Sequence, residues 1–315
     1  MKDLDIQALC DMRLAHERGD LDRQKFWELM RDHHLRLRAY PPLLAKGEVE
    51  SIQIGAMGLI AQLESGLKFF WNPENLREPV SEAVNHGAYE RFAGRVIDQC
   101  ARRASLVVDA GANIGWYSVK MAAAMAGGRV IAYEPVGDTA AVLKENIALN
   151  GFSDRITVIS RGLAARPGQG EIFLPRDTGH VGASLRELHP GEMSRKSVVR
   201  LTTLDESLPV NTAPPLDLLK CDVEGAELMV LQGGAAVIAR DRPVLFLELL
   251  RKWSAAFGYH PNEVIAWTEA LGYDCWAVGE GRLRHCETIA DDTVETNFLF
   301  VQLERDAALI EGLGG

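Results

Sequence analysis

Short apolar runs alternate with stretches of helical periodicity from about residue 105 onward. Buried strands are predicted at 105–109, 129–134, 155–160, 216–221 and 243–249, and helices at 116–126 and 138–150. A last antiparallel pair is predicted from 273–278 and 297–301. Because right-handed crossovers place the helices of such a chain on both faces of its strands, the pattern predicts an α/β fold with a mostly parallel sheet.

The first 45 residues have a purely helical pattern. Apolar residues recur at helical spacing on two consecutive segments, which predicts a helical hairpin. Gly19 is expected to end the first helix, Asp20 to cap the second, and Pro41-Pro42 to end it. Since the hairpin carries its own apolar face, we expect it to cap the main domain, to form an oligomer contact or to cover the substrate.

A turn-rich region joins this hairpin to the rest of the chain. The runs 59–63 and 67–71 flank Ser65-Gly66 and predict a β-hairpin. We therefore divide the chain into an extension over 1–84, made of the helical hairpin and the β-hairpin, and a main domain over 85–315.

The first strand of the main domain leads into a glycine turn with an acid at each of two strand ends. Gly111 and Gly115 carry no side chain that would block a ligand lying against the backbone. Asp109 can bind an ammonium group, directly or through water, and Glu134 can accept both ribose hydroxyls of an adenosine. S-adenosylmethionine carries both groups, so the turn predicts this cofactor.

Other readings of the turn are weaker. A dinucleotide site needs glycine at the third and sixth positions of the turn, where this chain has Asn113 and Trp116. The phosphate-loop pattern is absent as well. A generic turn between strand and helix, without a ligand, stays open.

Composition and charge narrow the classes of partner. The 315 residues are 47% hydrophobic and 25% charged, which is typical of a globular protein. A net charge of −10 argues against a general nucleic-acid binder, and no apolar run reaches membrane-spanning length. The start of the chain has no apolar signal core, and an odd number of cysteines, five, fits reduced thiols. We expect a cytoplasmic protein whose partner is neither a nucleic acid nor a membrane.

A second motif follows the strand predicted at 216–221, where Asp222, Glu224 and Glu227 lie together at the strand exit. With the glycine turn, this motif resembles the FkbM-type family of S-adenosylmethionine-dependent methyltransferases, over roughly residues 85–302. The motifs that carry the resemblance are Gly87-Ala88-Tyr89-Glu90, Asp109–Gly115, Tyr133-Glu134-Pro135, Thr203-Leu204-Asp205, Asp222–Glu227, Phe246-Leu247-Glu248 and Asn297–Phe300.

The resemblance implies a fold, an activity and a set of binding residues. The fold is the Rossmann-like class I methyltransferase sheet of seven mostly parallel strands, here with a helical N-terminal extension. The activity is O-methylation of a hydroxyl on a sugar, a glycan or a natural-product small molecule. The cofactor-binding positions are Glu90, Asp109, Ala110, Gly111, Ala112, Asn113, Gly115, Glu134, Pro135 and Asp222.

Methyl transfer to an alcohol also needs a group that takes the proton. Asp222 is the first candidate, although it could bind the methionine ammonium instead. His180, in a loop, is the second candidate, and Glu248, at the next strand end, is the third. With Glu224 these residues could hold a divalent metal, but no ligand spacing supports one, and we assign no metal ligands.

Two other functions stay open. An RNA or protein methyltransferase is disfavoured by the acidic charge, and by the sequence Cys221–Glu224 where an Asn-Pro-Pro-Tyr type of motif would stand. A non-catalytic binding protein on a methyltransferase fold is the other, and the intact glycine turn argues only for cofactor binding. A homo-oligomer formed through the N-terminal helices is a further expectation.

Overall fold

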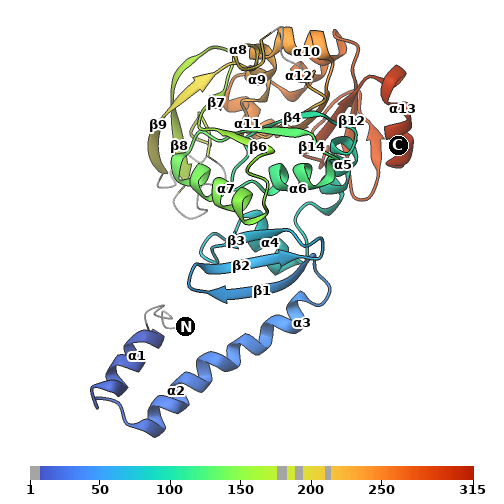
Figure 1. Cartoon of the computed structure of the whole chain (residues 1–315). Coiled ribbons are helices and arrows are strands. Elements are labelled where there is room, and N and C mark those ends of the chain that lie inside the picture. Colours follow the sequence, from blue (N-terminus) through green and yellow to red (C-terminus); the bar gives the residue numbers. More distant parts are fainter. Residues whose placement is uncertain (1–7, 176–182, 189–193, 210–213) are drawn as a thin grey trace.

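The computed structural model describes residues 8–175, 183–188, 194–209 and 214–315 (Figure 1). Its largest feature is an eight-stranded sheet with the order β13-β12-β14-β11-β10-β4-β5-β6. The strands are β4 (Leu106–Ala110), β5 (Arg129–Tyr133), β6 (Ile156–Ile159), β10 (Leu218–Cys221), β11 (Val244–Glu248), β12 (Asp274–Val278), β13 (Leu283–His285) and β14 (Asn297–Val301).

Strand direction confirms the predicted fold class. Strands β6, β5, β4, β10 and β11 pair in parallel, whereas β14 lies antiparallel between β11 and β12. This is the class I methyltransferase arrangement. The prediction of seven strands is wrong by one, because β13 adds an antiparallel edge to β12. With three residues, two of them exposed, β13 has no apolar run by which the sequence could have revealed it.

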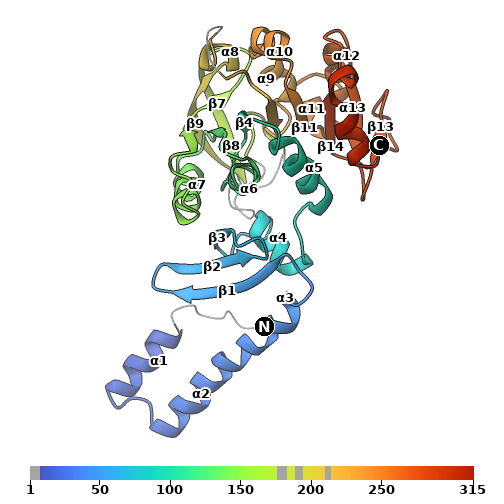
Figure 2. The same ribbon diagram turned by 45° about the vertical axis from the view of Figure 1, so that its right-hand side comes forward.

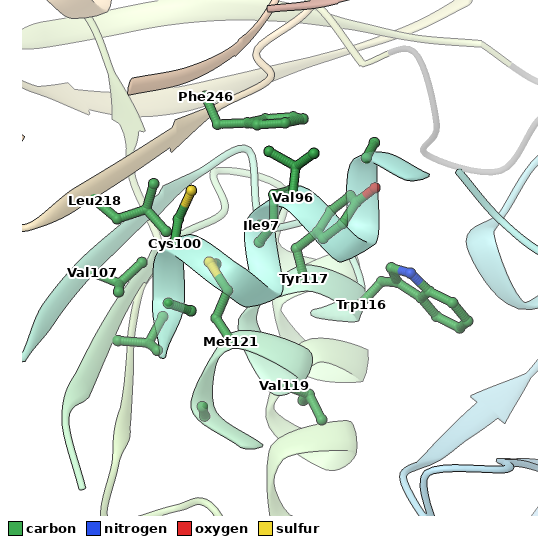
Figure 3. Packing of buried hydrophobic residues seen from close by; sticks show 14 of the residues in the cluster. Val96, Ile97, Cys100, Val107, Trp116, Tyr117, Val119, Met121, Leu218 and Phe246 are labelled. Carbon is green, nitrogen blue, oxygen red and sulfur yellow. The ribbon is translucent and has the colours of Figure 1, made fainter. Parts of the chain in front are cut away.

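Helices cover both faces of the sheet. The sheet divides the hydrophobic core into two clusters, one on each face. One face carries α5 (Arg91–Ala101), α6 (Trp116–Ala124), α7 (Gly137–Leu149) and α13 (Leu303–Gly312), and the other carries α8 (Leu204–Ser207), α9 (Glu227–Gly233), α10 (Ala235–Asp241) and α12 (Pro261–Glu269). Helix α11 (Arg251–Ala256) follows β11. Alternate strand residues enter opposite cores: Val107 packs in one and Val108 in the other. Figure 3 shows the first core, where α5 and α6 pack toward Val107, Leu218 and Phe246.

The extension consists of a helical arm and a three-stranded sheet. The arm comprises α1 (Ala8–Glu17), α2 (Arg23–Arg36), a short 3-10 helix η1 (Leu37–Ala39) and α3 (Tyr40–Leu44). Gly19 follows the end of α1 and has a φ of 81°, as expected of a glycine that ends a helix. Asp22, and not Asp20, is the N-cap of α2, since its carboxylate accepts from Gln24 N and Lys25 N at 3.0 Å each. Pro41-Pro42 does not end a helix but lies in the first turn of α3, where proline is tolerated.

The predicted β-hairpin is present and has a third strand. Strands β2 (Gly58–Leu63) and β3 (Lys68–Trp71) pair antiparallel, and β1 (Val49–Gly55) adds to β2. Four of the seven residues of β1 are exposed, so its sequence lacks the apolar signal of a buried strand. In Figures 1 and 2 the sheet lies against the main body, and α1 and α2 project away from both.

Two asparagines of α7 attach β3 to the main body. Asn146 accepts a hydrogen bond from Phe70 N at 2.8 Å and donates to Ile114 O at 2.8 Å. Asn150 accepts from Lys68 N at 2.8 Å and donates to Lys68 O at 2.6 Å. These amides take the place of a fourth strand along the edge of β3. The boundary expected after residue 84 falls within α4 (Pro79–His86), whose apolar residues share a core with both parts.

A second small sheet lies beside the carboxyl ends of β4 and β5. It has the order β7-β9-β8, from β7 (Gly162–Leu163), β9 (Ser194–Thr202) and β8 (Gly168–Pro175). Ser184 Oγ donates to the Glu224 carbonyl at 2.7 Å and fixes the loop after β8 to the turn that follows β10. Among the described residues, no helix is both long and apolar enough to cross a membrane.

Candidate active site

The glycine turn after β4 is shaped by its contact with the β10 turn. Gly111 has a φ of 77°, and a Cβ placed there would lie 1.8 Å from the Asp222 carbonyl oxygen. Gly115 has a φ of 89°, and its Cβ would lie 2.4 Å from Leu143 Cδ1. The expected reason for these glycines, open space for a ligand, is therefore incomplete: backbone conformation and protein packing already require them.

Glu134 holds this turn in place. Its Oε2 accepts from Asn113 N at 3.0 Å, and its Oε1 accepts from Val136 N at 2.8 Å. Asn113 has a φ of 49°, which L residues rarely adopt, so the bond to Glu134 stabilises an unfavourable conformation. Burial raises the pKa of Glu134 to about 7, against the two backbone hydrogen bonds, which lower it. Each carboxylate oxygen keeps a second acceptor site for a ligand.

A narrow cavity extends from Glu134 to the β10 turn and is covered by the small sheet. It encloses about 90 Å³, which is less than the about 300–1,000 Å³ typical of ligand sites. Predicted site residues that line the cavity are Gly111, Asn113, Glu134, Pro135 and Asp222, and apolar side chains of the cover include Leu163, Ile172 and Leu201.

Five predicted cofactor residues lie outside this lining: Glu90, Asp109, Ala110, Ala112 and Gly115. Asp109 is fully buried; its Oδ2 accepts from Ser118 Oγ at 2.6 Å, and its Oδ1 lies 3.6 Å from Lys220 Nζ. Burial raises its pKa, and Lys220 and Ser118 oppose that shift. Asp109 is connected to the glycine turn through Lys220, which donates to Gly111 O. Binding of a ligand's ammonium group by Asp109 stays a prediction.

Lys220 is the site residue that sequence reasoning missed. It lies in buried strand β10 with its Nζ 3.1 Å from Asp222 Oδ2 and 3.4 Å from Gly111 O. Burial would lower its pKa, but Asp222 and Asp109 outweigh burial, and the pKa rises above its usual value. A lysine within the apolar run Leu218–Cys221 was the available signal, because a buried ammonium needs acidic partners.

Acidic side chains gather on the β11 side of Asp222. Glu248 forms a hydrogen bond with Asp222, and burial together with Asp222 and Glu224 raises its pKa well above the usual value. Asp222 also faces Lys220, whose Nζ lies 3.1 Å from its Oδ2. Asn297, paired with Glu248 across β14 and β11, donates to Glu90 Oε1 at 3.0 Å. The structure thus brings two predicted catalytic residues together.

The remaining predicted residues have other positions. His180 lies outside the described residues. Glu227 is structural, because its Oε1 accepts from Val223 N at 3.0 Å and Gly225 N at 3.1 Å. Burial raises the pKa of Glu227 to about 7. In the part of the chain that the structure describes, no group of three or more His, Cys, Asp or Glu side chains is arranged to hold a metal.

A family model and a known relative match part of this chain. A family model described as the methyltransferase FkbM domain matches residues 109–275. The methyltransferase sdnD of Sordaria araneosa is 29% identical over an alignment of 153 residues, and the match covers 40% of this chain and 59% of that relative's length.

Two solved structures have a lower similarity. The methyltransferase FkbM of Methylobacillus flagellatus KT has 18% identity and a TM-score of 0.40, over 62% of this chain and 43% of that one. The O-methyltransferase TomG of Streptomyces achromogenes, solved with S-adenosylmethionine, has 13% identity and a TM-score of 0.42, over 68% of this chain and 80% of that one.

Proposed function

The chain belongs to the FkbM methyltransferase family, and from its site we propose that it transfers a methyl group from S-adenosylmethionine to a hydroxyl of a sugar, glycan or natural-product small molecule. The observation that carries the proposal is the pair of acids at the two ends of one cavity. Glu134 lies at the end of β5 and Asp222 after β10, with the glycine turn between them.

The chemistry of the lining fits this cofactor. Glu134 offers acceptor sites to two ribose hydroxyls, and the cover strands offer apolar side chains to an adenine. At the other end, Asp222 and Glu224 present carboxylates, which suit a molecule with a sulfonium and an ammonium group. When bound, S-adenosylmethionine supplies a methyl group on a positively charged sulfur.

Asp222 is the group that takes the acceptor's proton in this proposal. As the hydroxyl oxygen bonds to the methyl carbon and the carbon–sulfur bond breaks, the O–H proton passes to the Asp222 carboxylate. Lys220 orients that carboxylate, with its Nζ 3.1 Å from Asp222 Oδ2. Glu248 hydrogen-bonds to Asp222 from the end of the neighbouring strand β11. The products are a methyl ether and the neutral thioether of the cofactor.

Asp222→Asn tests this role, because asparagine keeps the size of the side chain and can still accept from Lys220. Turnover should fall by about 100-fold or more, and affinity for the demethylated cofactor should stay within a few-fold. Mass spectrometry of a panel of glycans and hydroxylated metabolites measures turnover, and calorimetry measures binding. Asp154→Asn, at an exposed loop position, is the control.

Three results would change the proposal. A loss of cofactor affinity in Asp222→Asn, with normal turnover at saturation, would assign Asp222 to the methionine ammonium. Binding without transfer to any acceptor would favour a non-catalytic binding protein. Preference of the wild type for a nicotinamide dinucleotide would overturn the cofactor.

We also place the protein in the cytoplasm, and the five free cysteines support that location.

A further inference from the structure

Glu48, between α3 and β1, is hydrogen-bonded to the segment Gly87–Glu90. This segment precedes α5 and borders the acidic residues on the β11 side of Asp222. Its backbone N donates to Gly87 O at 2.7 Å, and its Oε1 accepts from Tyr89 N at 2.7 Å. Its Oε2 lies 3.6 Å from Lys120 Nζ of α6, with both side chains largely buried. One residue of the N-terminal extension thus fixes two backbone groups of this segment and ties them to the main domain.

The segment has a constrained backbone. Gly87 has a φ of 85° and Glu90 a φ of 44°, so two of its four residues are left-handed. Gly47 packs so closely that a Cβ there would lie 3.1 Å from Gly87 Cα and Gly87 O. Because an L residue such as Glu90 rarely adopts this conformation unaided, its surroundings must hold it.

The held segment forms one wall of the acidic cluster. The Tyr89 ring lies edge-on to Trp116, with ring centroids 5.9 Å apart, and tilted toward Tyr117 at 6.3 Å. Glu90 accepts from Tyr117 Oη at 2.5 Å and from Asn297 Nδ2 at 3.0 Å. Burial raises the pKa of Tyr89, and the nearby carboxylates of Glu90, Asp222, Glu248 and Glu224 raise it further.

These contacts tie Glu90 to the β11 side of the site, because Asn297, which donates to Glu90, pairs with Glu248 across β14 and β11. In an open α/β sheet, ligands lie over the carboxyl ends of the strands. With the nucleotide over β4 and β5, the acceptor must approach over β10 and β11, where Asp222 and Glu248 end their strands. The segment Gly87–Glu90 therefore borders the acceptor's side of the site.

We propose that Glu48 is a positioning residue for methyl transfer, through which the N-terminal extension holds Tyr89 and Glu90 as a wall that aligns the acceptor with Asp222. The inference rests on the proposed function. In-line transfer depends on alignment, and a misplacement of about 1 Å can cost about 10²-fold in rate. The extension is then part of the site and more than an attached assembly element.

Steady-state kinetics with the full chain separates alignment from cofactor binding. Glu48→Ala should lower kcat/KM for the acceptor at least about tenfold and leave the Kd of the demethylated cofactor within about threefold. Glu48→Gln, which keeps an acceptor for Tyr89 N, should stay within about threefold of the wild type in both. Glu50→Gln is the matched control, since Glu50 lies two residues further on in β1, is exposed and accepts from Gln62.

Should Glu48→Ala not fold, Glu48→Asp takes its place, because its side chain is shorter by one methylene group than the one that bonds Tyr89 N at 2.7 Å. It should lose acceptor kcat/KM while Glu48→Gln keeps it. Equal kcat/KM in the aspartate and glutamine variants, or an equal loss of cofactor affinity and turnover, would overturn the proposal.

Hydrogen exchange of the Tyr89 amide, read by mass spectrometry, needs no turnover and separates this inference from the proposed function. Exchange should be faster in the Glu48→Ala or Glu48→Asp variant and unchanged in Glu50→Gln. A fall in turnover with unchanged exchange would show that Glu48 acts in another way. If the wild type transfers no methyl group, the proposed function fails, while faster exchange would still show that Glu48 holds the segment.

Discussion

Glu134 has two tasks at the scale of a single residue. It satisfies two backbone N–H groups of the protein, and it must still accept the hydroxyls of a ribose. Burial raises its pKa to about 7, so near neutral pH a fraction of the molecules carries the proton. A protonated carboxyl offers fewer acceptor sites than a carboxylate. Cofactor affinity should therefore depend on pH through this residue.

We predict that affinity for the demethylated cofactor rises by up to about tenfold between pH 6 and pH 8, since one pKa unit corresponds to a tenfold change. Calorimetry at each pH measures it. Glu134→Gln should bind more weakly and lose most of this dependence. A wild type with constant affinity over this range would exclude Glu134 as the ribose acceptor.

The same residue affects folding with a definite sign. A carboxyl whose pKa is higher in the folded than in the unfolded state contributes stability that is fully present below its unfolded pKa of about 4.5. That contribution is lost as pH rises through about 7, the folded pKa of Glu134. Glu227, with a pKa also raised to about 7 by burial, acts in the same direction.

Residues differ in how far the sequence reveals them. Glu134, Asp222 and Glu248 were predictable, because acids that follow apolar runs must lie at strand ends. Lys220 was not assigned, since its partners Asp109 and Asp222 meet only when β4 and β10 pair. The packing role of Gly111 was hidden for the same reason.

At the scale of elements, β3 and α7 make an unusual joint. Two side-chain amides satisfy a strand edge that would otherwise attract another strand. The sequence predicted β2 and β3 from their apolar runs and the tight turn between them. It could not show what covers the outer edge of β3, because Asn146 and Asn150 lie more than seventy residues away and read as ordinary helix positions.

Asn146→Ala should weaken this joint specifically. It leaves Phe70 N and Ile114 O without their partner, and each unpaired buried group costs about 1–3 kcal/mol. Thermal unfolding should show the loss of stability, and hydrogen exchange should increase in β3 before it increases in β4. Lys144→Ala, an exposed position on the same helix, is the control. Equal exchange of β3 in both variants would mean that apolar packing alone holds the sheet.

At the scale of the whole molecule, the helical arm stands apart from the sheets. Figures 1 and 2 both show α1 and α2 directed away from the main sheet, so neither covers it. Helix α2 has no buried residue, and Leu14, Trp27 and Leu35 are 44%, 57% and 44% exposed. Of the roles expected for this arm, an oligomer contact is the one that exposed apolar side chains favour.

We predict that the protein self-associates through this arm. Substitutions at exposed positions cost a monomer little stability, usually within about 0.5 kcal/mol, so a change in size reports association directly. Trp27→Glu and Leu35→Glu should each lower the mass measured by light scattering toward 34.7 kDa, the mass of one chain, without lowering the melting temperature. Val294→Glu, which changes an 85% exposed residue far from the arm in sequence, should leave the mass unchanged. A wild type that is monomeric at every concentration would contradict the prediction. In that case the arm would have to cover its apolar residues with a different partner, because monomeric proteins rarely leave such a patch exposed.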